Sequence, residues 1–312
     1  MSADGRGGRR GRRRDDEGGR TRSGDRRPAP RGGSRVNPYR LGLSRGAIEL
    51  RQVLRSHKDI YAYLSTPLLF LAVSFWLSRD GDDAMRQLSL AGGIGSTIFM
   101  SGLLTVPQFL FGDREDGTLL RLRGVPGAMT AYLTGKVFFV LVNIAVSIAL
   151  LLLGGRVLLG AALPDTPQRW LTLVWVVALG IVAVVPVGAA VGALLPVARE
   201  ALGLYMLPMM GLMIASGTFS QLRNLPEWMQ NLASFFPLRW IAQGVRSALL
   251  PDSARVMEVS GAWQHATVAG VLGLWAIAGL VLAPRLLQRM ARRESGSRLS
   301  EREQRRMAKT AY

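Results

Sequence analysis

The sequence predicts an all-α, polytopic membrane protein. The chain of 312 residues is 49% hydrophobic and yet has a net charge of +18, and its apolar and charged residues occupy separate stretches. A hydrocarbon core about 30 Å thick is crossed by a helix of roughly 20 apolar residues. Six stretches have this character, and we therefore predict six transmembrane helices, at residues 60–77, 88–111, 132–153, 170–195, 202–219 and 264–283.

Both ends of the chain are strongly basic. Residues 1–43 are rich in arginine and glycine and poor in apolar side chains, a composition typical of disorder. Residues 285–312 form a second basic tail. No aromatic side chain is interleaved with the arginines of residues 1–35, so we expect the first tail to contact anionic membrane lipids rather than nucleic acid.

Lysine and arginine also set the expected orientation. With both termini inside, the inner segments 1–59, 113–136, 196–200 and 285–312 contain most of the 39 basic residues, and the first outer loop is acidic. The basic side of a membrane protein faces the cytoplasm. We therefore predict that both termini are cytoplasmic.

Two of the cytoplasmic segments are expected to be helical. Residues 44–59 place apolar and charged side chains at helical spacing, with Ser44 as the N-cap, which is typical of an amphipathic helix on the membrane surface. Residues 114–125 place Thr118 and Leu119 on an apolar side and charged residues on the other. A helix held between two spans moves both when it is pushed; a long interfacial turn without a partner is the alternative.

The loop after the fifth span contains two further apolar runs. Residues 225–236 and 238–250 are separated by Pro237, and each is too short to cross a membrane. Trp228 and Trp240 suit the level of the lipid headgroups. We predict a pair of re-entrant helices on the outer side.

Polar side chains within the spans are sparse. Thr97 and Ser101 lie in the second span, and the fifth span is rich in methionine. Hydroxyl groups in such helices often bond to neighbouring helices. Methionine either fills a core or adapts to varied apolar ligands, and both interpretations stay open at this point.

The sequence offers little that suggests catalysis. Cysteine is absent, only two histidines are present, and no Walker A loop is found, so no metal site is expected and ATP would be bound by another chain. Ser216 and His265 leave open a rhomboid-like serine protease, although Ile214 stands where that motif has a glycine. An ion-driven secondary transporter is a further alternative, but the spans carry no buried acidic residue that would mark it.

Two groups of short motifs carry a resemblance to a known family. The first is Glu-Asp-Gly-Thr-Leu at 115–119, followed by a proline at 126 and Gly-Lys at 135–136. The second runs from Ser-Gly-Thr-Phe at 216–219 through Leu-Pro-Glu-Trp at 225–228 to Gly-Val-Arg at 244–246. Their order resembles the permease subunits of ABC-2-type exporters, the group that includes daunorubicin-resistance permeases.

The resemblance implies roles for four sets of residues. In that family the loop after the second span is a coupling helix that docks on an ATPase, an amphipathic connecting helix lies beside it, the second and fifth spans line the pathway, and the outer helix pair forms a gate. The corresponding residues are, for coupling, Glu115, Asp116, Thr118, Leu119, Arg121 and Arg123; for the connecting helix, Glu49, Arg51 and Arg55; for the pathway, Thr97, Met100, Ser101, Met206, Met209, Met210 and Met213; and for the outer gate, Phe219, Pro226, Trp228, Phe235, Phe236 and Pro237.

The resemblance also implies a function. The chain would be a permease without enzymatic activity or a cofactor of its own, and a cytoplasmic ABC ATPase would bind ATP and Mg²⁺. A second permease subunit would complete the pathway. The expected cargo is an amphiphilic drug, antibiotic or lipid-like molecule, exported across the inner (plasma) membrane of a bacterium.

Overall fold

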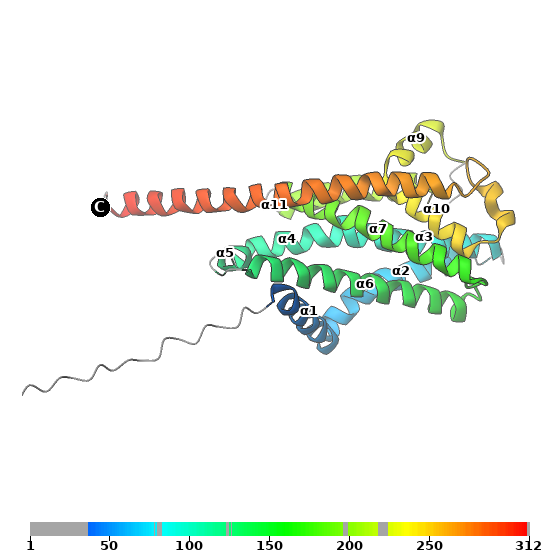
Figure 1. Ribbon diagram of the computed structural model, residues 1–312, viewed down its shortest axis with the longest axis horizontal. Coiled ribbons are helices and arrows are strands. Elements are labelled where there is room, and N and C mark those ends of the chain that lie inside the picture. Colours follow the sequence, from blue (N-terminus) through cyan, green and yellow to red (C-terminus); the bar gives the residue numbers. More distant parts are fainter. Residues whose placement is uncertain are drawn as a thin grey trace, which may run out of the picture. The chain divides into compact units, whose positions relative to one another are not determined.

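Helices make up all the regular structure in the part of the chain that the structure describes. The computed structural model describes residues 37–77, 79, 83–122, 125, 127–195, 199–217 and 224–310, without the side chains of residues 120, 199–202 and 291–310. Every regular element within these ranges is helical (Figure 1), which confirms the all-α prediction for them. The predicted tail over residues 1–36, Arg123 and Phe219 lie outside the described residues.

The chain divides into two units, and all the described helices lie in the second, residues 37–312. In chain order they are α1 Pro38–Arg55, α2 His57–Leu77, α3 Asp83–Met100, the π-helix η1 Ser101–Thr105, α4 Val106–Glu115, α5 Thr118–Leu122, α6 Ala128–Leu158, α7 Pro167–Leu194, α8 Arg199–Ala215, α9 Glu227–Phe235, α10 Pro237–Leu249, the 3-10 helix η3 Asp252–Met257 and α11 His265–Thr310.

Five helices are long and apolar enough to cross a membrane. They are His57–Leu77, Asp83–Glu115, Ala128–Leu158, Pro167–Leu194 and His265–Met290, and they cover five of the six predicted spans to within one residue. The protein is therefore a multi-pass membrane protein. The sixth predicted span, 202–219, corresponds to α8, which has 17 residues. At about 1.5 Å per residue α8 is about 26 Å long, short of the hydrocarbon thickness, so its crossing remains a prediction.

The second long helix, Asp83–Glu115, is the centre of the bundle. It comprises α3, η1 and α4, and 72% of its most apolar window is buried, against a third or less in the other four long helices. Its π-helical segment η1 ends just before Pro107, which has no N–H to donate to the carbonyl of Leu103. The Tyr205 hydroxyl of α8 donates to that carbonyl at 2.6 Å. The proline-disturbed turn is thus satisfied by a neighbouring helix, as membrane helices require.

The short helices after α8 differ in their surroundings. α9 and α10 are separated at Pro237, as predicted. α9 exposes Trp228, Leu232 and Phe235. Every residue of α10 is buried, because α10 packs between α3, α7 and α11. Trp240, which was expected at the level of the lipid headgroups, is buried with the rest of α10 in the core, and the re-entrant role of the pair stays a prediction.

The start of the described unit also differs from prediction. The first helix begins at Pro38, where the Asn37 side chain accepts from the Tyr39 N–H at 3.0 Å. Ser44 lies inside that helix and its hydroxyl donates to the Leu41 carbonyl, so it is not the N-cap. A break at Ser56 divides the predicted 44–59 segment between α1 and α2. At the other end, α11 continues through most of the predicted tail to Thr310.

Candidate functional site

The predicted coupling helix 114–125 is built from two pieces rather than one. α4 continues through Glu115, and the Asp116 N–H donates to the Gly112 carbonyl at 2.9 Å. Gly117 then adopts φ 68°, a left-handed conformation that reverses the chain at the end of a helix. α5 begins at Thr118. We call Glu115–Leu122 the coupling turn.

The coupling turn has an exposed charged side and a buried apolar side. Glu115, Asp116 and Arg121 are exposed and Thr118 is half-buried. Leu119 is only 3% exposed and lines a small cavity with side chains of α6 and α11. Its side chain therefore anchors the turn on this chain's own helices, and the charged residues are the ones available to a partner.

The last turn of α4 is attached to the end of α7. The Arg114 guanidinium donates to the carbonyls of Leu195 at 2.8 Å and Gly192 at 3.3 Å. These carbonyls belong to the C-terminal end of a helix, where the backbone lacks its own donors and carries partial negative charge. No sequence pattern pointed to Arg114, because its partners lie 78 and 81 positions away.

A second attachment joins the end of α4 to α1 and α6. The Lys136 ammonium lies 3.4 Å from a Glu49 carboxylate oxygen and 3.5 Å from an Asp113 oxygen. The Tyr132 hydroxyl donates to the same Asp113 oxygen at 2.5 Å. We call Glu49, Asp113, Tyr132 and Lys136 the Lys136 cluster. The structure thus brings Glu49 of the predicted connecting helix to the coupling region.

The other two residues predicted on the connecting helix, Arg51 and Arg55, are exposed on α1. They lie outside the Lys136 cluster. Their predicted role toward an ATPase stays a prediction.

A cavity of about 450 Å³ lies between α2, the central helix, α6 and α8. Five of the predicted pathway residues line it, contributed by the central helix and α8: Thr97, Met100, Ser101, Met206 and Met210. Met209 and Met213 instead pack against the hydrophobic core. The lining also includes residues that the pathway prediction missed, namely Asp59, Tyr63, Thr66, Gln108, Asn143 and Ser147.

Three of the predicted outer-gate residues, Phe235, Phe236 and Pro237, lie at the bend between α9 and α10, and Pro226 and Trp228 lie at the start of α9. Phe236 stacks on Trp275 of α11 with ring centroids 6.2 Å apart, and the Trp275 indole donates to the Phe235 carbonyl at 2.9 Å. Pro237 is buried, whereas the side chains of Pro226, Trp228 and Phe235 are exposed. The bend is therefore fixed to α11.

The N-terminal part of α10 is attached to α9 by a cation. The Arg239 guanidinium donates to the Gln230 carbonyl at 3.2 Å and to the Ser234 hydroxyl, and lies 4.9 Å from the Trp240 ring centroid. Burial lowers the pKa of Arg239 from its ordinary value because it disfavours the charged form.

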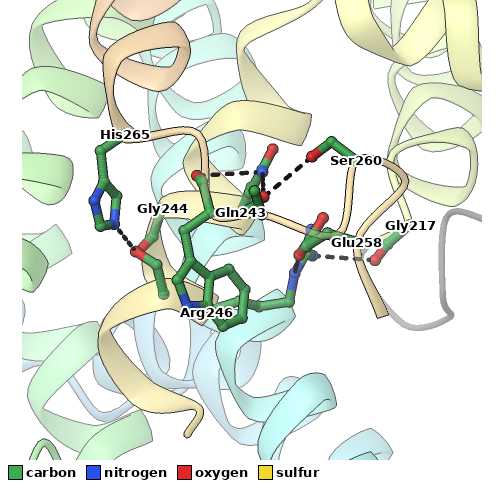
Figure 2. A network of polar contacts seen from close by, with 10 residues as sticks. Gly217, Gln243, Gly244, Arg246, Glu258, Ser260 and His265 are labelled. Carbon is green, nitrogen blue, oxygen red and sulfur yellow. Dashed lines mark hydrogen bonds and ion pairs between the residues drawn. The ribbon is translucent and has the colours of Figure 1, made fainter. Parts of the chain in front are cut away.

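A buried ion pair connects α10 to the segment before α11. Arg246 Nε donates to Glu258 Oε1 at 2.6 Å and Nη2 donates to Oε2 at 3.2 Å, with both side chains 4% exposed. Arg246 Nη1 also donates to the Gly217 carbonyl at 3.4 Å, as Figure 2 shows. The arginine of the Gly-Val-Arg motif thus joins the end of α8 to the connection between α10 and α11.

Further polar contacts hold that connection on α10. Gln243 Nε2 donates to the carbonyls of Ala262 at 3.1 Å and Trp263 at 3.2 Å, and His265 Nε2 lies 3.1 Å from the Ser247 hydroxyl oxygen (Figure 2). At the surface, hydrogen bonds from Arg255 and Trp263 lower the pKa of Asp252. These contacts attach the connection between α10 and α11 to α10.

Comparison with known families decides what kind of protein carries these features. The family described as ABC-2 family transporter protein matches residues 60–284. The chain belongs to the ABC-2 transporter family. The match begins near the start of α2 and ends within α11, so it includes the coupling turn, most of the cavity lining and the buried contacts of Arg246. No curated protein matches the sequence closely enough to count as a relative.

Membership in the ABC-2 family confirms the resemblance seen in the short motifs. Proteins of this family are membrane subunits of transporters that associate with an ABC ATPase. This ABC-2 protein is accordingly a transport subunit. Within the described ranges, its acidic and histidine side chains form no group of three that could hold a metal ion.

The geometry of this ABC-2 protein gives no support to the protease alternative. The Ser216 hydroxyl is buried and donates to the Leu212 carbonyl at 2.5 Å, whereas His265 contacts Ser247. A serine nucleophile needs its base within hydrogen-bond reach. Ser216 and His265 each have a different partner, so the structure does not bring the proposed pair together.

Proposed function

We propose that this ABC-2 protein is the permease of an ATP-driven exporter. A separate ABC ATPase would bind ATP and Mg²⁺, and the permease would move an amphiphilic drug, antibiotic or lipid-like molecule out of the cytoplasm or the inner leaflet. One observation carries the proposal: the 33-residue helix Asp83–Glu115 both lines the 450 Å³ cavity and ends at the exposed coupling turn. A push on the turn therefore acts on the wall of the cavity.

The central helix has a segment suited to this transmission. η1 contributes Ser101, Leu104 and Thr105 to the cavity wall. A π-helical turn beside a proline is a point where a helix changes direction at low cost. ATPase closure would favour one of two positions of the α4 end, because a ligand shifts an equilibrium by its different affinity for the two states.

The composition of the cavity wall supports an amphiphilic cargo. Hydroxyl and amide groups stand beside the flexible methionines Met100, Met206 and Met210, and none of the described residues that line the cavity is a lysine or an arginine. Methionine repacks around apolar groups of different shape, and the polar groups pair with hydrogen-bonding parts of a ligand. Asp59 supplies a carboxylate that suits a cationic group.

The assembly and its orientation follow the same proposal. Two permeases and two ATPases would form the exporter in the inner membrane of a bacterium, with both permease termini in the cytoplasm. Leu119 of the coupling turn and Met290 of α11 line one small cavity. The basic part of α11 beyond Met290 therefore begins at the level of the coupling turn. This agrees with the proposal that the coupling turn and the basic C-terminal segment both face the cytoplasm.

Transport in inside-out vesicles tests the proposal. With the ATPase co-expressed, we expect uptake of doxorubicin or a fluorescent phospholipid analogue to require ATP. Met210→Trp would narrow the cavity and is expected to reduce uptake about tenfold, equivalent to about 1.4 kcal/mol of lost binding. Ile214 is exposed on α8 like Met210 but does not line the cavity, so the control variant Ile214→Trp should transport normally.

Two results would contradict this expectation. Uptake that survives ATP depletion but collapses with the ion gradient would favour a secondary transporter. Equal uptake by the Met210→Trp and Ile214→Trp variants would show that the cavity is not on the transport pathway.

A further inference from the structure

We propose that Lys136 is a positioning residue that latches the α1–α6 helix pair to the end of α4, so that movement of the coupling turn reaches α6. This inference deepens the proposed function and rests on it, because the ATPase is what would move the turn. The latch consists of the Lys136 cluster, with one cation shared by carboxylates from two other helices.

α1 and α6 form one closely packed pair. A Cβ atom at Gly42 would lie 2.6 Å from the Ala131 carbonyl oxygen, and one at Gly46 would lie 2.8 Å from the Gly135 oxygen. Such distances leave room only for glycine, as in tightly packed membrane helices. α1 therefore moves together with the part of α6 that carries Lys136.

α4 belongs to a different set of contacts. It packs along α7, where Gly192 lies against Pro107 and Arg114 bonds the carbonyls at the α7 end. Between α4 and α6 lies an apolar groove of about 300 Å³, bordered by Leu110 on one side and by Val137 and Lys136 on the other. Beside this groove α4 touches α6 through Phe109, which lies edge-to-face against Phe139 with ring centroids 5.8 Å apart.

Polar contacts cross this groove at its edge. Asp113 bonds Tyr132 at 2.5 Å and faces Lys136 at 3.5 Å, and the Lys136 ammonium also lies 4.9 Å from the Phe109 ring centroid. The neighbouring residue Arg114 points to α7. Two adjacent side chains in the last turn of α4 therefore attach the coupling turn to two helices, α6 through Asp113 and α7 through Arg114.

The charges make the latch depend on the cation. Lys136, Glu49 and Asp113 have side chains 20%, 28% and 19% exposed, so their interactions are only partly screened by solvent. Without the lysine charge, the two carboxylates would repel each other. The Lys136→Met variant should therefore separate α1 from the end of α4, whereas Lys136→Arg should keep them together.

Distances between spin labels test the latch in the permease alone. The natural sequence has no cysteine, so cysteines introduced at the exposed positions Arg40 of α1 and Glu115 of α4 are labelled selectively. In lipid nanodiscs we expect a narrow distance distribution with Lys136 or Lys136→Arg, and a broader one shifted to longer distances with Lys136→Met. Lys58→Met, an exposed lysine on α2, is the matched control and should leave the distribution unchanged.

Transport with the ATPase tests the consequence. We expect Lys136→Met to bind the ATPase normally but to transport about fivefold less doxorubicin per ATP hydrolysed, a loss at the lower end of measured coupling effects. Lys136→Arg should restore most of the transport.

The spin-label experiment and the transport experiment test different parts of the proposal. An unchanged label distance in Lys136→Met would overturn the latch, and a changed distance with unchanged transport per ATP would overturn its role in coupling. If the unsubstituted permease binds no ATPase, the proposed function is wrong, while the label distances still decide whether the latch exists.

Discussion

The Glu258→Ala variant is expected to lose about 3–5 kcal/mol of folding free energy, the cost of removing one partner of a buried ion pair. The variant leaves the Arg246 guanidinium, 4% exposed, without the two carboxylate contacts that it has now. Only the bond to the Gly217 carbonyl at 3.4 Å would remain among the contacts described for Arg246. The buried charge, rather than a lost attraction, accounts for most of the expected effect.

Thermal and denaturant-induced unfolding of the purified protein in detergent measures this loss. Arg255→Ala removes a partner from the exposed pair with Asp252, and such pairs contribute about 0–1 kcal/mol. The double variant Arg246→Met/Glu258→Met should recover most of the stability, because it removes both charges and keeps apolar volume. A Glu258→Ala protein as stable as Arg255→Ala would show that the buried charge of Arg246 does not need its carboxylate partner.

Gly188→Ala is expected to be the most disruptive alanine substitution in α7. A Cβ atom at this position would lie 1.8 Å from the Gly102 carbonyl oxygen of η1, which is backbone and cannot rotate away. α7 would have to move from the central helix, at a cost of about 1–3 kcal/mol or more. Because η1 lines the cavity, any folded Gly188→Ala protein should also transport poorly.

A second glycine substitution separates crowding from a general effect of alanine. A Cβ atom at Gly273 of α11 would meet open space, and alanine favours a helix over glycine by about 1 kcal/mol. Gly273→Ala should therefore be as stable as the natural protein. We would measure the yield of monodisperse protein and its melting temperature. Equal values for Gly188→Ala and Gly273→Ala would contradict the close crossing of α7 and η1.

The long apolar helices could be predicted from the sequence because hydrophobicity is a property of continuous stretches. The long helices of the structure cover five predicted spans to within one residue. The boundaries and the short elements were less predictable. The Ser44 N-cap was wrong, because Asn37 followed by Pro38 offers a better start. The burial of α10 was missed because its short apolar run and Trp240 suggested a position at the level of the lipid headgroups.

In the candidate site, too, features that depend on a continuous stretch of sequence were predicted, and features that depend on contacts between distant residues were not. The pathway hydroxyls and methionines lie on predicted spans, and five of them line one cavity. Leu119 has the right motif position but is buried, which depends on where α6 and α11 run. Arg114, Asp113 and Glu258 were not predicted as structural links, because each is defined by a partner that only the fold brings near.

The measurement that tests the central claim most directly is co-purification with an ABC ATPase expressed in the same cells. The test variant is Glu115→Arg/Asp116→Arg, which reverses two exposed charges of the coupling turn; a Leu119 variant is unsuitable because that side chain is part of the core. Glu227→Arg, an exposed acidic residue on α9, is the matched control. We predict that the natural protein and the control bind the ATPase and that the double variant folds but does not. ATPase binding by all three proteins, or by none, would contradict the account.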